Sequence, residues 1–195
     1  MAHPDILPNA VLDEVAKQIG TRLASVGTVE KLRTARVELA ESFSVWMLGL
    51  EPIARRDENI NRLPRDTGLY HHQIAYNGRG EAYARSAPSR PGVELRVLEE
   101  ISESTLAVRT AAAIDWIDEH IKDDPLVRLL VVPSYFLHAF WLHYPRADKI
   151  LVVDRPVEYE LLRYDVLYDF RELFHMLANE KPVQGLPPAP REAAQ

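Results

Sequence analysis

The chain has 195 residues, of which 47% are hydrophobic and 27% are charged, and these proportions predict a globular protein with one well-buried core. The net charge of -6 argues against a nucleic-acid partner, because such proteins normally need a basic surface to neutralise phosphates. The absence of cysteine excludes disulfides, Cys-ligated zinc, iron–sulfur clusters and a thiol nucleophile.

Targeting signals are not visible in the sequence. Residues 1–5 have neither the basic region nor the apolar region of a signal peptide. The longest apolar stretch, residues 129–142, is interrupted by Pro133 and is too short to span a bilayer. We therefore expect a cytoplasmic protein that makes no contact with a membrane.

The first third of the chain has the apolar spacing of helices. Asn9 is a suitable N-cap for an amphipathic helix that ends at Gly27. A second helix is predicted over residues 28–50, because its apolar residues recur every three or four positions. These residues are Leu32, Ala35, Leu39, Phe43, Trp46 and Leu50. The short connection at Gly27 indicates an antiparallel helical hairpin.

Residues 69–86 carry the clearest local pattern, that of a β-hairpin. Two strand-like runs flank the Asn-Gly pair at 77–78, which favours a two-residue hairpin turn. The simplest register pairs His72 with Tyr83, although Gly80 leaves a longer loop and a shifted register open. In the simplest register, the aromatic and polar face carries Tyr70, His72, Ile74, Tyr76, Glu81, Tyr83 and Arg85. The other face has mostly small side chains, on which a helix could pack closely.

The segments around this hairpin are less regular. Residues 51–68 mix charges of both signs between two prolines, which indicates an exposed connection. Residues 93–97 alternate apolar Val and Leu with Glu94 and Arg96, so a third, half-buried strand is expected there with Arg96 outside. An amphipathic helix is predicted over residues 106–121, before Pro125.

Two apolar runs, residues 127–132 and 149–153, are typical of central strands buried on both faces. The segment between them, residues 134–144, is apolar throughout and is compatible with either a strand or a helix. A strand would complete an antiparallel meander, and we favour it because the upstream hairpin already indicates an antiparallel sheet. A helix would instead give a short βαβ unit around residues 127–153, and thus an α/β fold.

The C-terminal part is expected to end in one helix and a tail. Asp169 and Glu172 resemble a capping box for a helix over residues 169–179. Residues 183–195 are rich in Pro and Ala and are typical of a flexible terminus. The predicted organisation is therefore one α+β domain over residues 1–182, in which the helical hairpin and further helices pack on a mainly antiparallel sheet.

The sequence contains none of the common catalytic or cofactor motifs, so no catalytic residue, cofactor or metal site is assigned. His71 and His72 point to opposite faces of a strand, as do His138 and His143, which argues against a shared metal ion. Ser134 follows a strand but lacks the small neighbours of a hydrolase nucleophile, and it is interpreted as a cap or turn residue.

Two groups of residues remain as candidate binding sites. Tyr70, His72, Glu81, Tyr83 and Arg85 could bind a small ligand on the hairpin, although cross-strand aromatic pairs also explain them. Tyr135 and Trp141 belong to an aromatic cluster that fits a core, and either would become an interface anchor if it reached the surface.

Two functions are compatible with these patterns. The first is a non-enzymatic, intracellular binding protein that acts through protein contacts, with a protein partner or a second copy of itself. It rests on the missing catalytic motifs, the aromatic density and the predicted long helix of residues 28–50. The second is a small-molecule-binding domain or enzyme that uses the residue 69–86 hairpin, with His72 as acid or base.

Overall fold

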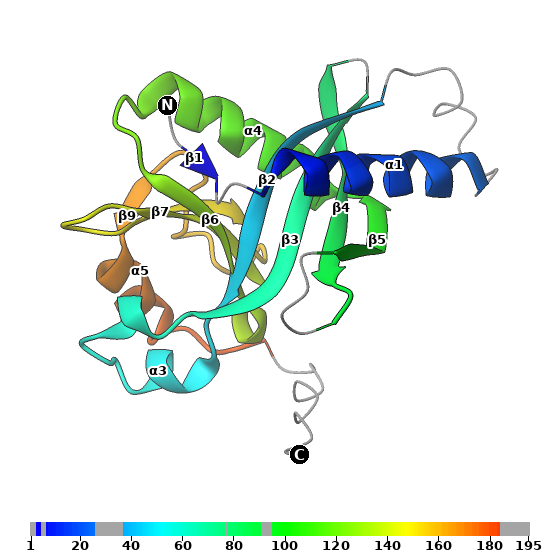
Figure 1. Cartoon of the computed structure of the whole chain (residues 1–195). Helices are drawn as coiled ribbons and strands as arrows, with labels where there is room; N and C mark the ends of the chain where they lie inside the picture. The colour runs from blue at the N-terminus through cyan, green and yellow to red at the C-terminus, as the bar shows by residue number, and fades with distance from the viewer. Residues whose placement is uncertain (1–2, 5–6, 26–36, 77, 91–94, 184–195) are drawn as a thin grey trace.

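The computed structural model describes residues 3–4, 7–25, 37–76, 78–90 and 95–183. They form an α+β fold built on one nine-stranded sheet (Figure 1), whose order is β5-β4-β3-β2-β6-β7-β8-β9 with β1 beside β6. The strands are β1 (His3–Pro4), β2 (Val37–Met47), β3 (Arg65–Tyr76), β4 (Arg79–Pro88), β5 (Arg96–Glu103), β6 (Leu126–Val132), β7 (Leu137–His143), β8 (Lys149–Asp154) and β9 (Leu167–Asp169). The helices are α1 (Asn9–Ser25), α3 (Leu50–Ala54), α4 (Thr105–His120) and α5 (Phe170–Leu177).

The predicted second helix of the N-terminal hairpin is wrong over residues 37–47, which form β2, and residues 26–36 lie outside the described part of the chain. Phe43 belongs to the predicted helical stripe, but Phe43 and Val45 also alternate with Ser42 and Ser44 as strand residues do. β2 pairs with β3 on one side and β6 on the other. Pairing on both sides outweighs the local helical spacing.

The predicted β-hairpin is confirmed as β3 and β4, but its register shifts after the turn. Tyr76 pairs with Arg79 as expected, and a bulge then pairs Ile74 with Ala82 and His72 with Ala84. The bulge follows Gly80, the residue that left the register open. One added residue moves every later side chain of β4 to the other face of the sheet.

The segment at residues 134–144 forms strand β7, which is antiparallel to both β6 and β8. The βαβ alternative around residues 127–153 is therefore wrong, and the antiparallel meander is confirmed. The sheet is mainly antiparallel, with parallel pairing only where β6 meets β1 and β2 among the described strands.

Helices cover both faces of the sheet (Figure 1). α1 packs on one face of β3, β4 and β5 through Val15 and Ile19. α4 packs on the opposite face of these strands and extends across β6, β7 and β8. α5 covers the other face of β6–β8, where its Phe170 and Phe174 meet the largest apolar cluster. α4 is thus the helix shared by both halves of the sheet.

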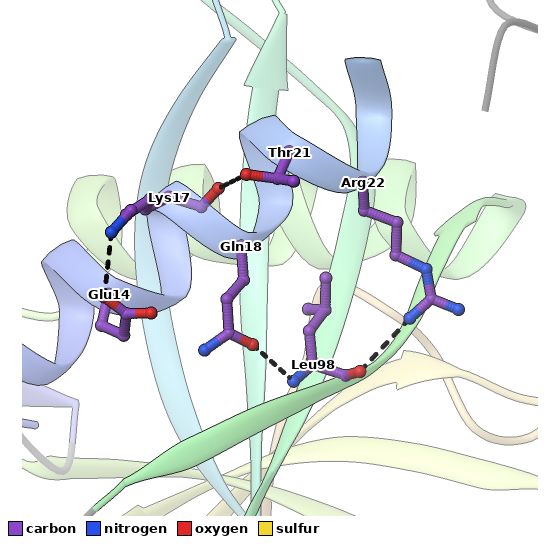
Figure 2. Close-up of a pocket in the computed structure, with 6 residues that line it drawn as sticks. All are labelled: Glu14, Lys17, Gln18, Thr21, Arg22 and Leu98. Carbon is purple, nitrogen blue, oxygen red and sulfur yellow. Dashed lines mark hydrogen bonds and ion pairs between the residues drawn. The ribbon is translucent and has the colours of Figure 1, made fainter. Parts of the chain in front are cut away.

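α1 also covers the free edge of the sheet at β5, as Figure 2 shows. The Gln18 amide donates to the carbonyl of Arg96 and accepts from the N–H of Leu98, both at 3.0 Å. Arg22 donates to the carbonyl of Leu98 at 3.2 Å. These side chains hydrogen-bond to backbone groups of β5 that would otherwise be free to bond an added strand. They therefore protect the sheet edge from pairing with another chain. They border a hollow of about 390 Å³.

β5 differs from its predicted orientation. It spans residues 96–103 rather than 93–97, and residues 91–94 lie outside the described part of the chain. Arg96 is buried, whereas Leu95 and Val97 are 55% and 48% exposed. The guanidinium of Arg96 is accommodated because it donates to the carbonyls of Gly68 and Ser86. A buried charge that is fully hydrogen-bonded can take a place that alternation would give to an apolar residue.

The C-terminal helix is confirmed as α5, capped by Asp169, whose carboxylate accepts from the Arg171 N–H at 3.0 Å. Val183 is the first residue of the expected tail, and its N–H donates to the Ser134 carbonyl at 3.0 Å. The rest of the tail lies outside the described residues. The connection at residues 51–68 is exposed in part but is anchored by the fully buried Ile53 and Ile60.

Candidate functional site

The shifted register divides the hairpin residues predicted to bind a ligand. Tyr70 and His72 lie on the α1 side of the sheet, whereas Tyr83 and Arg85 lie on the α4 side. Glu81 sits at the bulge, is exposed, and borders a separate hollow of about 700 Å³ near the start of α4. The five residues therefore do not form one site, and His72 does not face Tyr83.

The α1 side contains a group of linked side chains, here called the α1-face network, made of Ser42, Tyr70, His72, Ser86 and Arg96. Hydrogen bonds link the four buried residues, and the half-buried Tyr70 adds a ring contact with Arg96. His72 lies between two hydroxyls, with Nδ1 2.8 Å from the Ser42 Oγ and Nε2 2.7 Å from the Ser86 Oγ. Arg96 donates to the Ser86 Oγ at 2.8 Å and stacks over the Tyr70 ring at 4.6 Å.

The α1-face network pairs both ring nitrogens of His72. Arg96 can only donate, so the Ser86 hydroxyl accepts from it. A neutral imidazole donates through one ring nitrogen and accepts through the other, and because a hydroxyl can do either, both tautomers fit the bonds to Ser42 and Ser86. The neutral form agrees with the pKa of His72, which burial and the nearby Arg96 lower to about 4.

The α4 side presents a different group of residues around His71. Its ring is stacked on Tyr83 with centroids 4.7 Å apart, and Arg85 is its partner across the strand pair. The Tyr83 hydroxyl donates to Glu100 at 3.1 Å, and Arg85 lies 3.8 Å from the same carboxylate. His71 is fully buried, while the Arg85 side chain is 26% exposed.

A second set of residues reaches the same region from the other half of the sheet. β2 and β6 pair over only three residues, and the two halves run in different directions in Figure 1. His138 on β7 is the cross-strand neighbour of Asp154 on β8, which forms an ion pair with Arg109 of α4. Arg85 faces His71 across the strand pair, and its positive charge lowers the pKa of both His71 and His138.

These seven residues, here called the α4-face cluster, are His71, Tyr83, Arg85, Glu100, Arg109, His138 and Asp154. Their buried nitrogen atoms set them apart from the α1-face network. Nε of Arg85 and Nδ1 of His138 are buried without a hydrogen-bond partner among the described residues. The ring nitrogens of His71 and the Oε1 of Gln73 likewise lack a well-formed hydrogen bond, although Gln73 acts on the pKa of His71 as a hydrogen-bond partner. Buried polar atoms are normally paired, so a group of unpaired ones requires an explanation such as ligand binding.

Burial keeps both histidines of the α4-face cluster neutral. It lowers the pKa of His71 to about 3 and that of His138 to about 4, and the positive charge of Arg85 lowers both further. Gln73 opposes this for His71 as a hydrogen-bond partner, and the negative charge of Asp154 opposes it for His138. Such weak bases are poor proton acceptors at neutral pH, so the cluster is better suited to binding than to proton transfer.

The aromatic residues predicted as possible anchors are part of the core. Tyr135 is 2% exposed and Trp141 is 4% exposed, and both belong to the cluster beneath α5. Neither can anchor a partner in this conformation. Their neighbour Phe136 is 43% exposed and adopts a left-handed backbone with φ of 45°.

Comparisons with protein-family models, curated proteins and solved structures give no match, so the function has to be inferred from the site. Among the described residues, no three His, Asp or Glu side chains lie close enough to hold a metal ion. The described helices include none that is both long and apolar enough to cross a membrane.

Sequence reasoning identified Tyr83 and Arg85 but missed the residues that accompany them. His71 was considered only as a metal ligand, and Arg109 was not considered. Alternation along β3 places His71 on the other face of the sheet from His72, and the bulge after Gly80 places Arg85 on the same face as His71. Gly80 was the one signal in the sequence for this pairing. No local signal brings His138 and Asp154 to the same place, because that depends on how the sheet bends.

Proposed function

We propose that the chain binds a small ligand through an oxyanion, a carboxylate or phosphate group, held by the α4-face cluster. The observation that carries this proposal is the convergence of buried, unpaired nitrogens from Arg85, His71 and His138 in one region. This deepens the second of the two functions that the sequence allows and moves it from His72 to His71.

The chemistry of the unpaired atoms favours an anion. The Nε of Arg85 is a donor under all conditions and never an acceptor, so its partner must be an acceptor, and an anionic oxygen is the strongest one. Hydrogen bonds from a guanidinium to an anionic oxygen are about twice as strong as those between neutral groups. A bound anion also favours protonation of nearby imidazoles, which converts the two ring systems into further donors.

Inorganic phosphate titrated into the full chain tests the proposal by isothermal calorimetry. We expect saturable binding of one phosphate, and Arg85→Gln should weaken it about 10–100-fold, the usual cost of a charge-assisted bond. Arg79→Gln is the matched control, because Arg79 lies exposed on the same strand. If neither phosphate nor acetate binds, or if both variants weaken binding equally, the proposal is wrong.

The protein-contact function is a second candidate, supported by two exposed apolar side chains. Val157 and Leu161 are 76% and 71% exposed and are interspersed with the exposed Glu158 and Glu160. The predicted helix of residues 28–50 no longer supports this function, because residues 37–47 lie inside the sheet. Sedimentation over a range of concentrations tests it. Self-association that Leu161→Asp abolishes would support a second copy as partner, and a monomer throughout would exclude it.

A further inference from the structure

A pocket of about 290 Å³ lies beside the α4-face cluster, between α4, β8 and the segment before β9. It is lined by Arg109, Ala112, Ala113, Trp116, Val152, Val153, Tyr164 and Asp165. Its α4 residues are spaced three, four and seven positions after Arg109, so they share one side of the helix. The two alanines leave space that larger side chains would fill.

The aromatic walls of this pocket are held in place. Trp116 stacks on His120 with ring centroids 4.4 Å apart and nearly parallel planes, at 9°. Two guanidinium groups, those of Arg109 and Arg155, lie over the Tyr164 ring, each 5.0 Å from its centroid. Rigid aromatic side chains offer contact area at little entropic cost, which is what a small apolar ligand requires.

Arg109 connects the pocket to the α4-face cluster. It lines the pocket, and it forms an ion pair with Asp154, the cross-strand neighbour of His138. An oxyanion near His138 and an apolar group beside Trp116 would therefore flank the same guanidinium. A dry cavity of about 150 Å³ is already enough to hold benzene, so this pocket has room for one ring and a short linker.

We propose that the pocket beside Trp116 takes the aromatic ring of the ligand whose oxyanion is bound by the α4-face cluster. This inference rests on the proposed function and names its ligand class, an arylalkyl carboxylate with a single ring. Burial of the ring against Ala113, Val153 and Trp116 supplies the apolar part of the affinity, and the cluster orients the carboxylate.

Acetate and 3-phenylpropionate, titrated separately into the full chain, test this assignment by calorimetry. The ring should raise the affinity about 10–100-fold over acetate, the gain expected for burying one ring. The ring should also change the fluorescence of Trp116, a signal that Trp116→Phe removes.

A filled pocket provides the sharper test. Ala112→Leu narrows the pocket from the exposed side of α4, and we expect it to remove most of the gain from the ring without changing acetate binding. Val108→Leu is the matched control, because Val108 borders the hollow near the hairpin that Ala112 also borders, but not this pocket. If acetate binds and the ring adds nothing, the pocket assignment is wrong while the anion site stands. If neither ligand binds, the anion site itself is wrong.

Discussion

His71 and His72 are adjacent in the sequence, yet they occupy two different chemical environments. His72 lies in the α1-face network, where both ring nitrogens meet hydroxyl groups within 2.8 Å. His71 lies in the α4-face cluster, where neither ring nitrogen makes a well-formed hydrogen bond among the described residues and Gln73 is a weak partner. Both rings are fully buried. Burial alone therefore does not separate a structural histidine from a candidate ligand-binding one, whereas the completeness of its hydrogen bonds does.

The difference has an energetic consequence. A buried polar group that has its partners contributes modestly to stability, whereas one left unpaired costs about 1–3 kcal/mol. The α1-face network is therefore a stabilising part of the fold. The unpaired nitrogens of the α4-face cluster are destabilising, and under the proposed function an acceptor that binds there offsets their cost.

Acid should destabilise the protein through the histidines on both faces. The pKa of His71 is lowered to about 3 and those of His72 and His138 to about 4, against 6.5 for an unperturbed side chain. The unfolded state therefore binds more protons between these values, so stability is complete above about pH 6.5 and falls as the pH decreases. Between pH 7 and pH 5 the loss is about 2 kcal/mol for each fully buried ring, and less for the partly exposed His138.

Urea denaturation at the two pH values measures this loss. Saturating phosphate should offset the part that comes from the α4-face cluster, because a bound anion stabilises protonated His71 and His138. An unfolding free energy that is constant from pH 7 to pH 5 would contradict the buried, neutral state of these rings.

Replacing each adjacent histidine with leucine should have opposite consequences. His72→Leu leaves Ser42, Ser86 and Arg96 without their central partner, so we expect a loss of about 2–4 kcal/mol. His71→Leu removes unpaired atoms and keeps an apolar contact with Tyr83, so its effect should lie within about 1 kcal/mol of zero. Chemical denaturation of the two variants compares them directly, and equal losses would show that His71 is as well satisfied as His72.

The smallest expected effect concerns the packing of α4 on its face of the sheet. A Cβ at Gly80 would lie 2.6 Å from the Cβ of Ala111 and 2.7 Å from the Gln73 amide. Gly80→Ala should therefore cost about 1–3 kcal/mol by overpacking and should weaken phosphate binding while leaving the α1-face network intact. Adding Ala111→Gly should relieve the contact and restore part of the binding. If Gly80→Ala leaves phosphate binding unchanged, the proposed site does not depend on the position of α4.

The sequence was sufficient to predict those parts of the fold that depend on local patterns. α1, the β3–β4 hairpin, α4, the β6–β8 meander and α5 all follow from spacing and turn residues. It failed at β2, where pairing with β3 and β6 outweighs a helical stripe, and at Arg96, where three side-chain hydrogen bonds and a Tyr70 contact permit burial.

The candidate site was predictable only in part, for a related reason. Tyr83 and Arg85 were chosen from composition, but the residue facing them depends on a single bulge after Gly80. The contributions of His138, Asp154 and Arg109 depend on the bend between β2 and β6, and no local pattern in the sequence encodes that bend. Pairings that are distant in the chain decide which polar groups meet.

Imidazole nitrogen NMR of the full chain at pH 6, with and without inorganic phosphate, tests the central claim most directly. All three buried rings should be neutral without phosphate, because burial lowers the pKa of each to 4 or below. With phosphate bound, His71 and His138 should shift toward the protonated form while His72 stays neutral. The account is contradicted if phosphate changes none of the three, or if it changes His72 as much as His71.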